Sequence, residues 1–558
     1  MTLRPLLLAL AALGCASTPR APASPAGTLT LTVVGTSDLH GRVEMLPWLG
    51  GHLRVLRAMR DGAVVLVDAG DMFQGTIASN GDEGATVVAA YNSLGYDAAA
   101  VGNHEFDYGP EGEASFAAHP GENPRGALLA RAREAGFPFL AANFSEGDGL
   151  WQAPNLRPST VREVRGVRVG IIGVSTIHTP ETTLSANVRG LAMLPLAASI
   201  VREATALRRD GATVVIVAAH AGGSCTRFND PNDLSSCEDR EEVMDLARAL
   251  PAGAVDLIVG GHTHRGMAHV VNRVPVIQSF ANGVALGRAD ITVDLSTRRV
   301  QGVRVLAPRS LCAGQRGEPD ASRCAPAPYE GATVTPDESV ARAIAPAVAR
   351  AEGIRARELG VTLPGGLDTR YDRESPLPNL LALAMRTAAH ADVGLQNHGG
   401  VRVDLPAGPL RYGSLYNTLP FDNRLVTIRL RGRALAEVIA RNAGSDSGAL
   451  AVSGVRAVVR CEGDRRVATL TRDDGRPVGD DEVLTVATND YLASGSLRER
   501  AESPLSDDET LRAPTLRDAV IDVLRALGPT LSGEDPRWFE PARLRITLPG
   551  PRPVRCGG

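Results

Sequence analysis

The hexapeptide at residues 102–107, Gly-Asn-His-Glu-Phe-Asp, gathers side chains that can bind a metal and transfer a proton. It follows the apolar stretch 97–101 and is expected to leave a buried strand. Asn103 offers a neutral oxygen to a metal, and His104 an imidazole that can act as a general acid. Asp107 lies three residues further on and can orient that imidazole. The stretch therefore predicts part of a metal-dependent catalytic site.

Four other predicted strands are followed by residues of the same chemistry. These are Asp38 and His40 in Ser-Asp-Leu-His-Gly, Asp71 in Gly-Asp-Met-Phe-Gln-Gly, His220 in Val-Ile-Val-Ala-Ala-His, and His262 and His264 in Gly-Gly-His-Thr-His. A single histidine after a strand is more often structural. Sites in open α/β sheets, however, gather at the carboxyl ends of strands, where five such clusters can converge. Donors of the types His, Asp and Asn suit Mn, Fe, Zn, Mg or Ca and disfavour copper or iron–sulfur chemistry.

The elements that must position these clusters form an alternating pattern. Apolar, β-rich runs recur between helical stretches from residue 28 to residue 308, which is typical of a layered α/β domain. Strands are expected at residues 29–34, 64–67, 98–101, 168–174, 213–219 and 256–259. Residues 309–335 are rich in Pro, Gly and Arg and are expected to form a surface linker.

A second domain of α/β or α+β type is expected at residues 359–548. Before it, Val340, Ile344, Val348 and Ile354 recur at near-helical spacing within residues 336–358, which predicts a helix. We expect that helix to link two domains; the alternative is an ordinary first helix of the second domain. A chain of 558 residues exceeds what one hydrophobic core usually supports, which favours two domains.

The composition is that of an ordinary soluble globular protein, with 44% hydrophobic and 22% charged residues. The net charge of −4 and the lack of a basic run give no sign of a nucleic-acid partner. The sequence does not indicate an oligomeric state.

The amino-terminal residues predict export. Arg4 precedes an apolar run at residues 6–13 that ends in Gly14 and Cys15. Residues 1–14 therefore resemble a signal peptide that is too short to span a bilayer. The end resembles a lipobox, so a lipid anchor at Cys15 in the cell envelope or periplasm is expected as the only membrane contact. Ala12 stands where a lipobox usually has Leu, so ordinary cleavage and secretion is the alternative. Residues 15–27 are expected to be a flexible tether.

The cysteines fit an oxidising compartment. Four of the seven form close pairs that bracket polar loops, and Cys461 and the near-terminal Cys556 could form a third bridge. Free thiols or metal ligands are the alternative, although neither close pair has Cys-x-x-Cys spacing. The expected disulfides are Cys225–Cys237, Cys312–Cys324 and Cys461–Cys556.

Together the five motifs resemble the 5′-nucleotidase family of dinuclear calcineurin-like metallophosphatases. The resemblance spans essentially the whole mature chain. It implies a four-layer metallophosphatase β-sandwich flanked by helices, followed by an α/β (α+β) substrate-binding domain. It also implies two divalent metal ions, one held by Asp38, His40 and His264 and the other by Asn103, His220 and His262. Asp71 would bridge them, with Gln74 close by.

The chemistry of such a site explains the residue types. Two metals roughly 3.5–4 Å apart can clamp the attacking and leaving oxygens of an in-line phosphoryl displacement, and they lower the pKa of water. No serine or cysteine nucleophile is then needed. The resemblance implies that His104, steered by Asp107, stabilises charge in the transition state and helps the leaving group depart.

The second domain resembles the carboxyl-terminal domain of the same family. Residues 396–402, Gln-Asn-His-Gly-Gly-Val-Arg, match a family Asn-Gly-Gly-Gly-Ile-Arg segment, and residues 419–423, Leu-Pro-Phe-Asp-Asn, match a Pro-Phe loop. The resemblance implies that Phe421 and Tyr491 stack on the base of a nucleotide and that Asn397 and Arg402 are polar substrate contacts. The alternative is that both aromatic residues belong to the core of the domain.

The chain departs from the family next to Tyr491. Relatives usually continue with Gly-Gly-Asp-Gly, whose carboxylate touches the nucleoside, whereas residues 494–498 read Ser-Gly-Ser-Leu-Arg. An upstream family arginine also lacks a match at the aligned Tyr371, which Arg370 and Arg373 flank as candidate substrate contacts. These differences concern recognition of the nucleoside and leave hydrolysis of the phosphate ester untouched.

The sequence therefore predicts an exported phosphohydrolase that acts on nucleoside 5′-phosphates or related nucleotides by metal-activated water. Its partner would be a small-molecule nucleotide or other phosphate ester. One alternative is hydrolysis of another ester, such as a cyclic nucleotide, a sugar nucleotide or a sulfur-oxyanion conjugate. A second is a surface-binding lipoprotein without turnover, which the intact ligand set disfavours.

Overall fold

The computed structural model describes residues 27–112, 114–117, 119, 121–313, 320–445, 448–503, 505, 510 and 513–557. The predicted signal peptide, Cys15 and nearly all of the predicted tether lie outside these residues. Within the described part of the chain, no helix is long and apolar enough to cross a membrane.

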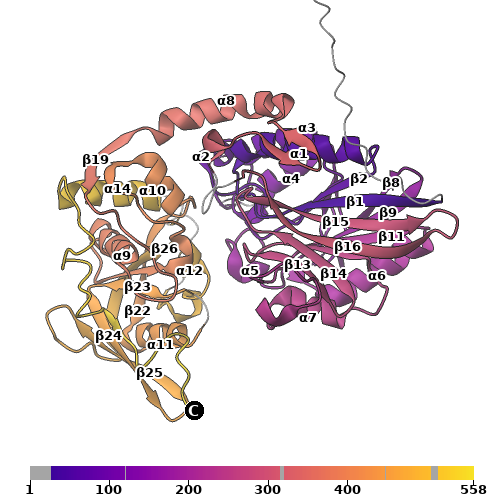
Figure 1. Ribbon diagram of the computed structural model, residues 1–558. Helices are drawn as coiled ribbons and strands as arrows, with labels where there is room; N and C mark the ends of the chain where they lie inside the picture. Colours follow the sequence, from indigo (N-terminus) through magenta and orange to yellow (C-terminus); the bar gives the residue numbers. More distant parts are fainter. Residues whose placement is uncertain are drawn as a thin grey trace, which may run out of the picture.

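Two β-sheets form the centre of the first domain (Figure 1). The first sheet contains β1 (Thr28–Thr36), β2 (Val64–Asp68), β3 (Ala98–Ala100), β4 (Phe139–Leu140), β7 (Leu156–Arg157), β15 (Ala285–Asp294) and β16 (Arg299–Ser310). The second contains β8 (Ser159–Val164), β9 (Val167–Ser175), β11 (Val214–His220), β12 (Leu257–Gly260), β13 (Gly266–Val271) and β14 (Val274–Ser279). Their strand orders are β16-β15-β1-β2-β3-β4-β7 and β13-β14-β12-β11-β9-β8.

An apolar core joins the two sheets face to face. Val33 and Val65 of the first sheet and Ile171 and Ile216 of the second are fully buried in one cluster. Burial of a Val or Ile side chain stabilises the fold by roughly 1.5–3 kcal/mol. Strands buried on both faces read as continuous apolar runs, which is why their positions could be predicted.

Helices cover the outer face of each sheet. The first sheet packs on α1 (Leu46–Met59), α3 (Ala85–Leu94) and α4 (Gly126–Glu134). The second packs on α6 (Leu196–Arg209) and α7 (Glu242–Ala249). The layers run helix, sheet, sheet, helix, which confirms the predicted four-layer fold.

The strands that carry the five motifs run parallel within their sheets. β1 pairs with β2 and β2 with β3, while β11 pairs with β9 and β12. Their carboxyl ends therefore meet at one end of the sandwich. Shorter elements connect the layers: η1 (Val43–Met45), α2 (Ile77–Asn80), η2 (His104–Phe106), β5 (Phe144–Glu146), β6 (Gly149–Leu150), α5 (Thr179–Thr182), β10 (Leu191–Met193), η3 (Leu234–Ser236), η4 (Ala321–Arg323), β17 (Ala327–Tyr329) and β18 (Ala332–Val334).

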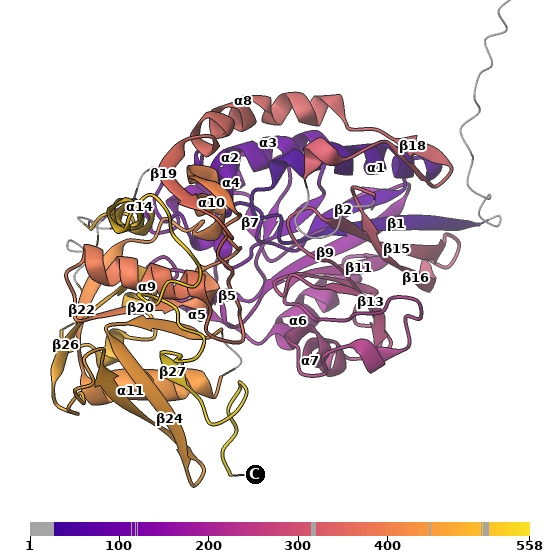
Figure 2. The same cartoon turned by 60° about the vertical axis from the view of Figure 1, so that its left-hand side comes forward.

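The helix predicted at residues 336–358 is α8 (Glu338–Arg355). Asp337 caps it by accepting hydrogen bonds from the N–H groups of Ser339 and Val340. Its buried side chains, among them Val340 and Ile344, join the core under the first sheet's helices. Figure 2 shows α8 running above α2 and α3 toward β19 (Glu358–Leu363) of the second domain. The helix thus spans the junction, while the exact domain boundaries stay predictions.

The second domain is a smaller α+β unit. Its main sheet has the order β22-β26-β20-β23, formed by β22 (Leu425–Arg431), β26 (Val483–Asn489), β20 (Val393–Asn397) and β23 (Leu450–Ser453). Two further sheets contain β19 with β21 (Gly408–Arg411), and β25 (Arg465–Arg472) with β24 (Val455–Glu462) and β27 (Ile546–Thr547). One core lies under α9 (Pro376–Ala388) and α14 (Leu516–Leu527), and another under α11 (Gly432–Ala443). The remaining elements are η5 (His398–Gly400), α10 (Tyr412–Thr418), α12 (Asp490–Ser494) and η6 (Arg498–Arg500).

The predicted disulfides are present. They join Cys225 to Cys237, Cys312 to Cys324, and Cys461 to Cys556. Disulfides of this kind are typical of proteins in an oxidising compartment, which agrees with the predicted export.

Candidate metal centre and substrate cleft

The predicted ligands converge where the parallel strands end. They are Asp38 and His40 after β1, Asp71 after β2, Asn103 after β3, His220 as the last residue of β11, and His262 and His264 after β12. Among the described residues, Asp38, His40, Asp71 and His264 form one group of candidate ligands. Asp71, His220 and His262 form another, and within each group the donor atoms lie within 4.8 Å of one another. Asp71 belongs to both groups, as expected of a bridging carboxylate.

The turns that present these ligands have left-handed backbone conformations. The φ angle is +53° at Asp38, +48° at His40, +59° at Asp71, +76° at His262 and +58° at His264. Such conformations are uncommon for residues with a side chain and cost of order 1–3 kcal/mol each, so they persist only where the surroundings impose them. Their concentration in five candidate ligands marks this region as a functional site.

Hydrogen bonds fix the orientation of two imidazoles. Nδ1 of His40 donates to the Gln74 carbonyl at 2.9 Å, and Nδ1 of His220 donates to the Ala69 carbonyl at 2.8 Å. A carbonyl can only accept, so each Nδ1 carries the proton and each Nε2 faces the site as a ligand nitrogen. Gly70 allows this approach, because a Cβ at that position would lie 2.9 Å from Nδ1 of His220.

Several atoms at the centre are acceptors that face one another. Nε2 of His220 lies 2.9 Å from Oδ1 of Asn103, whose amide N–H donates to the Thr182 carbonyl. Oδ2 of Asp38 is buried and has no hydrogen-bond partner among the described residues. Converging buried acceptors of this kind require a proton or a cation between them. The donor set fits hard or borderline divalent metal ions.

Burial sets the charge state of most of these groups. It lowers the pKa of His40 and His262 to about 3, so both imidazoles are neutral, the form that binds a metal. Burial also raises the pKa of Asp38 to about 7. His220 differs: burial lowers its pKa, but the nearby Asp71 carboxylate outweighs this and raises it to about 10, so a proton on Nε2 takes the place that a metal ion would occupy. Asp71 therefore stays ionised and attracts positive charge to the centre.

Glu105 was not among the predicted site residues, yet it fixes Asp71. Its buried carboxylate accepts hydrogen bonds from the backbone N–H groups of Asp71 (2.9 Å), Met72 (2.6 Å) and Gly102 (2.7 Å). Burial raises the pKa of Glu105 to about 8, and each hydrogen bond of this kind contributes roughly 0.5–1.5 kcal/mol. A carboxylate inside the hexapeptide at residues 102–107 was the signal that could have revealed it.

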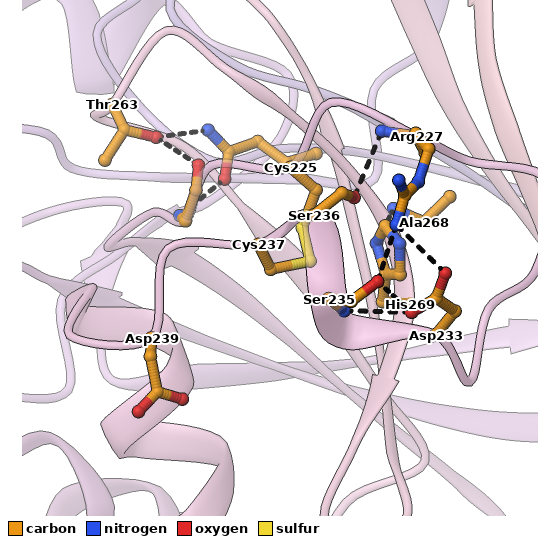
Figure 3. Close-up of a disulfide and its surroundings, with 12 residues drawn as sticks. Cys225, Arg227, Asp233, Ser235, Ser236, Cys237, Asp239, Thr263, Ala268 and His269 are labelled. Atoms are coloured by element: carbon orange, nitrogen blue, oxygen red, sulfur yellow. Dashed lines mark hydrogen bonds and ion pairs between the residues drawn. A yellow bond between two sulfur atoms is a disulfide. The ribbon is translucent and has the colours of Figure 1, made fainter.

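A ring of hydrogen bonds ties the His262–His264 turn to the strand below it. The Gly223 N–H donates to Oε1 of Gln278 (3.0 Å), Nε2 of Gln278 donates to Oγ1 of Thr263 (2.7 Å), and that hydroxyl donates to the Gly223 carbonyl (2.7 Å). The Cys225–Cys237 disulfide closes the loop that begins beside this ring (Figure 3). Sequence reasoning missed Gln278, because nothing in its local pattern marks it.

His104 is held as a candidate acid. Its Nδ1 lies 2.6 Å from Oδ2 of Asp107, and Oδ1 of Asp107 accepts a hydrogen bond from the Thr183 hydroxyl at 2.8 Å. Burial lowers the pKa of His104, but the Asp107 and Asp71 carboxylates outweigh it and raise the pKa above its usual value. The protonated form, which a general acid requires, therefore persists to higher pH than in an unperturbed histidine.

A cleft of about 1890 Å³ lies between the two domains and reaches the metal centre. The Phe421 ring stacks on His104 with centroids 5.6 Å apart, and the Arg402 guanidinium lies 5.8 Å from the centroid of Phe421. The Gln74 amide donates to the Pro420 carbonyl at 2.9 Å, and the Tyr491 hydroxyl donates to the Glu181 carbonyl. Side chains from the second domain thus face the metal centre.

The structure brings Asn397, Arg402, Phe421 and Tyr491 to the lining of this cleft, but it does not bring Arg370 or Arg373 there. Arg370 forms an ion pair with Asp368 instead. Phe421 belongs to none of the apolar clusters found among the described residues, whereas Tyr491 packs partly on the core under α11. The alternative of a core aromatic therefore fits Tyr491 better than Phe421.

Comparison with known families agrees with this geometry. Residues 31–266 match the family "Calcineurin-like phosphoesterase", and residues 355–498 match "5'-nucleotidase, C-terminal domain". The chain belongs to the 5′-nucleotidase family of calcineurin-like phosphoesterases, which are phosphoric ester hydrolases that use divalent metals. The predicted resemblance and enzyme class are confirmed.

Relatives resemble the chain over most of its length. "Endonuclease YhcR" of Bacillus subtilis is 26% identical over 85% of this chain, and "Cell wall protein Lmo0130" of Listeria monocytogenes is 25% identical over 84%. The chain spans only 38% and 64% of the lengths of these two proteins. The "5'-nucleotidase" of Diplobatis ommata is 27% identical over 84% of this chain and 83% of its own length.

A solved structure shows the same fold. The 5′-nucleotidase precursor from Thermus thermophilus superposes with a TM-score of 0.68 at 23% sequence identity. The match covers 93% of this chain and 99% of the other. The two-domain arrangement is therefore shared by the two proteins.

Proposed function

We propose that the chain is an exported, dinuclear-metal phosphohydrolase that releases phosphate from nucleoside 5′-phosphates or related nucleotides. The observation that carries the proposal is the pair of candidate ligand groups that share Asp71 and face an aromatic, basic cleft wall. The relatives that are named 5′-nucleotidases support the substrate class. The disulfides and the relative named a cell wall protein support export.

Each residue in the centre has a role in this proposal. Asp38, His40 and His264 would hold one ion, Asn103, His220 and His262 the other, and Asp71 both. When bound, two divalent ions supply Lewis-acid polarisation of the phosphoryl group and lower the pKa of water. Glu105 keeps the Asp71 turn in place, because its carboxylate holds the backbone on both sides of the bridging residue.

His104 and Arg402 both line the cleft and would act on the substrate. His104, protonated and oriented by Asp107, donates a proton or hydrogen bond to the departing oxygen. This donation stabilises the negative charge that develops on that oxygen in the transition state. Arg402 places a guanidinium near the phosphoryl group, where planar, bidentate donors suit anionic oxygens. Asn397, Phe421 and Tyr491 would contact the nucleoside.

A phosphate-release assay tests the proposal. Purified full-length mature protein is given a panel of nucleoside monophosphates, sugar nucleotides, cyclic nucleotides and an aryl phosphate, with Mn²⁺ added. We expect hydrolysis of nucleoside 5′-phosphates that a chelator abolishes and divalent metal restores. Metal binding without turnover of any ester would favour the binding-lipoprotein alternative, and turnover confined to another ester would exclude nucleotidase activity.

A further inference from the structure

The Cys225–Cys237 disulfide fastens a loop that lies beside the metal centre (Figure 3). The loop leaves β11 directly after the candidate ligand His220, which is the last residue of that strand. Further along the loop, the Cys225 N–H donates to the Gly266 carbonyl at 3.2 Å. Gly266 begins β13, two residues after the candidate ligand His264. Cys225 therefore connects the segment that follows one ligand to the segment that follows another.

The disulfide clamps the two ends of this loop together. Cys225 and Cys237 lie opposite each other in an antiparallel bridge. Next to the bridge, the Glu238 N–H donates to the Ser224 carbonyl at 2.8 Å. The backbone at residues 224–225 lies outside the helices and strands. The disulfide and this hydrogen bond thus hold a segment that no regular element supports.

The residues just before the clamp pack against the turn at residues 261–264, which carries two candidate ligands. The Gly223 carbonyl accepts a hydrogen bond from the Thr263 hydroxyl at 2.7 Å, and Thr263 stands between those two ligands in the chain. The contact at Gly222 is closer still, because a Cβ there would lie 2.0 Å from the Gly261 carbonyl oxygen. Protein interiors are close-packed and transmit strain, so a shift of this backbone shifts the turn as well.

We propose that the Cys225–Cys237 disulfide is a positioning element for the metal centre. It keeps residues 222–225 in place against the turn at residues 261–264, and that turn presents two of the candidate ligands. Groups that orient metal ligands from outside strengthen metal binding. The metal affinity of the protein therefore depends on whether this disulfide is formed. The inference rests on the proposed dinuclear centre and is independent of which ester is hydrolysed.

Reduction of the disulfide begins at Cys237, because its side chain is half-buried whereas Cys225 is only 4% exposed. A thiolate of a dithiol reductant attacks Sγ of Cys237, the S–S bond breaks, and the Cys225 thiolate leaves and takes up a proton. The second thiolate of the reductant then attacks its own sulfur in the mixed disulfide. This step releases Cys237 as a thiol and leaves the reductant as a cyclic disulfide. Two electrons thus pass from the reductant to the protein, and the loop is released.

The test removes this disulfide and, as a matched control, the Cys312–Cys324 disulfide that follows β16. Both join cysteines 12 residues apart, so their loss restores about the same conformational entropy to the unfolded chain. Calorimetric titration of the apoproteins with Mn²⁺ measures metal affinity, because Mn²⁺ prefers oxygen and imidazole ligands to thiols. Cys225→Ser/Cys237→Ser should weaken Mn²⁺ binding about threefold to tenfold, and Cys312→Ser/Cys324→Ser less than about twofold.

Two further measurements separate positioning from other effects. Wild-type protein that has been reduced and freed of the dithiol should bind Mn²⁺ as weakly as Cys225→Ser/Cys237→Ser. The same treatment should not weaken Mn²⁺ binding by that variant any further. Amide hydrogen exchange at residues 261–266 of the apoproteins should be faster in Cys225→Ser/Cys237→Ser than in wild type, and unchanged in Cys312→Ser/Cys324→Ser.

Two results overturn the inference. One is an unchanged Mn²⁺ affinity and an unchanged hydrogen exchange in Cys225→Ser/Cys237→Ser. The other is an equal loss of affinity in both double variants with equal falls in melting temperature, which indicates general destabilisation. A wild-type protein that binds no Mn²⁺ refutes the proposed metal centre instead. Hydrogen exchange at residues 261–266 then decides the positioning role of the disulfide separately.

Discussion

The two walls of the cleft are built in opposite ways. On the first domain, most candidate ligands are buried, five of the seven sit in left-handed turns, and backbone N–H groups of Asp71 and His262 donate to the side chains of Glu105 and Asp38. On the second domain, Arg402 and Tyr371 are exposed to the cleft, and few hydrogen bonds hold them. The first wall can tolerate few substitutions, because each side chain there orients several neighbouring groups. The second wall can change residue by residue, so it suits a role in specificity.

The largest expected effect is loss of metal from the first wall. His262 forms a group of candidate ligands with Asp71 and His220. His262→Ala should therefore remove at least one bound metal per chain and reduce hydrolysis to near background. Elemental analysis measures the metal content, and phosphate release measures the rate of hydrolysis. His390→Ala, which changes an exposed histidine of the second domain, is the control. An unchanged metal content would show that His262 is not a ligand.

The next largest effect is expected from a variant of that wall that impairs catalysis without loss of metal. His104→Ala should keep the metal content and slow turnover by a factor of about 10²–10⁴, because the proton donor is lost. The measurement is kcat together with elemental analysis. A variant that loses metal would mean that His104, and not only its neighbour Asn103, serves as a ligand.

The pH profile of activity tests the role of His104 in a variant that keeps the imidazole. The Asp107 carboxylate helps to raise the pKa of His104 above its usual value, so the protonated acid persists to higher pH. Activity should fall as pH rises through that raised pKa. Asp107→Asn removes the raising charge and should move the alkaline fall of kcat to lower pH. A profile that stays in place would show that another group sets it.

A smaller effect is expected from Gln278, which supports the turn that carries His262 and His264. Gln278→Leu removes both hydrogen bonds that hold Thr263 and Gly223, so the His262–His264 turn loses its support. Loss of such an orienting partner typically weakens metal affinity about 10–100-fold. Metal titration of the apoprotein measures this, with Gln301→Leu on the exposed face of β16 as the matched control. Equal affinities for Gln278→Leu and wild type would leave the ring without a role in metal binding.

The same contrast explains what could be predicted from the sequence. The strands were predicted because residues such as Val65 and Ile216 lie in continuous apolar runs, and the ligand residues because His and Asp stand at the strand ends. Gln278 could not be found, because it acts through the side chain of Thr263, fifteen residues earlier. Arg370 and Arg373 were expected at the cleft from their positions in the sequence. Neither arginine lines the cleft, whereas their neighbour Tyr371 does, and Arg370 forms an ion pair with Asp368.

The smallest expected effect concerns Phe421 on the second wall. Its ring stacks on His104 and lies outside the apolar clusters of the described residues, so its removal should cost little stability. Stacking on a base contributes roughly 1–3 kcal/mol, so Phe421→Ala should raise KM for adenosine monophosphate about tenfold. Cleavage of an aryl phosphate without a nucleoside should fall less, since the first wall carries the chemistry. Comparing kcat/KM for the two substrates, with thermal melting, decides the matter. An equal fall on both with a lowered melting temperature would assign Phe421 to packing, and the second wall would then recognise the base without it.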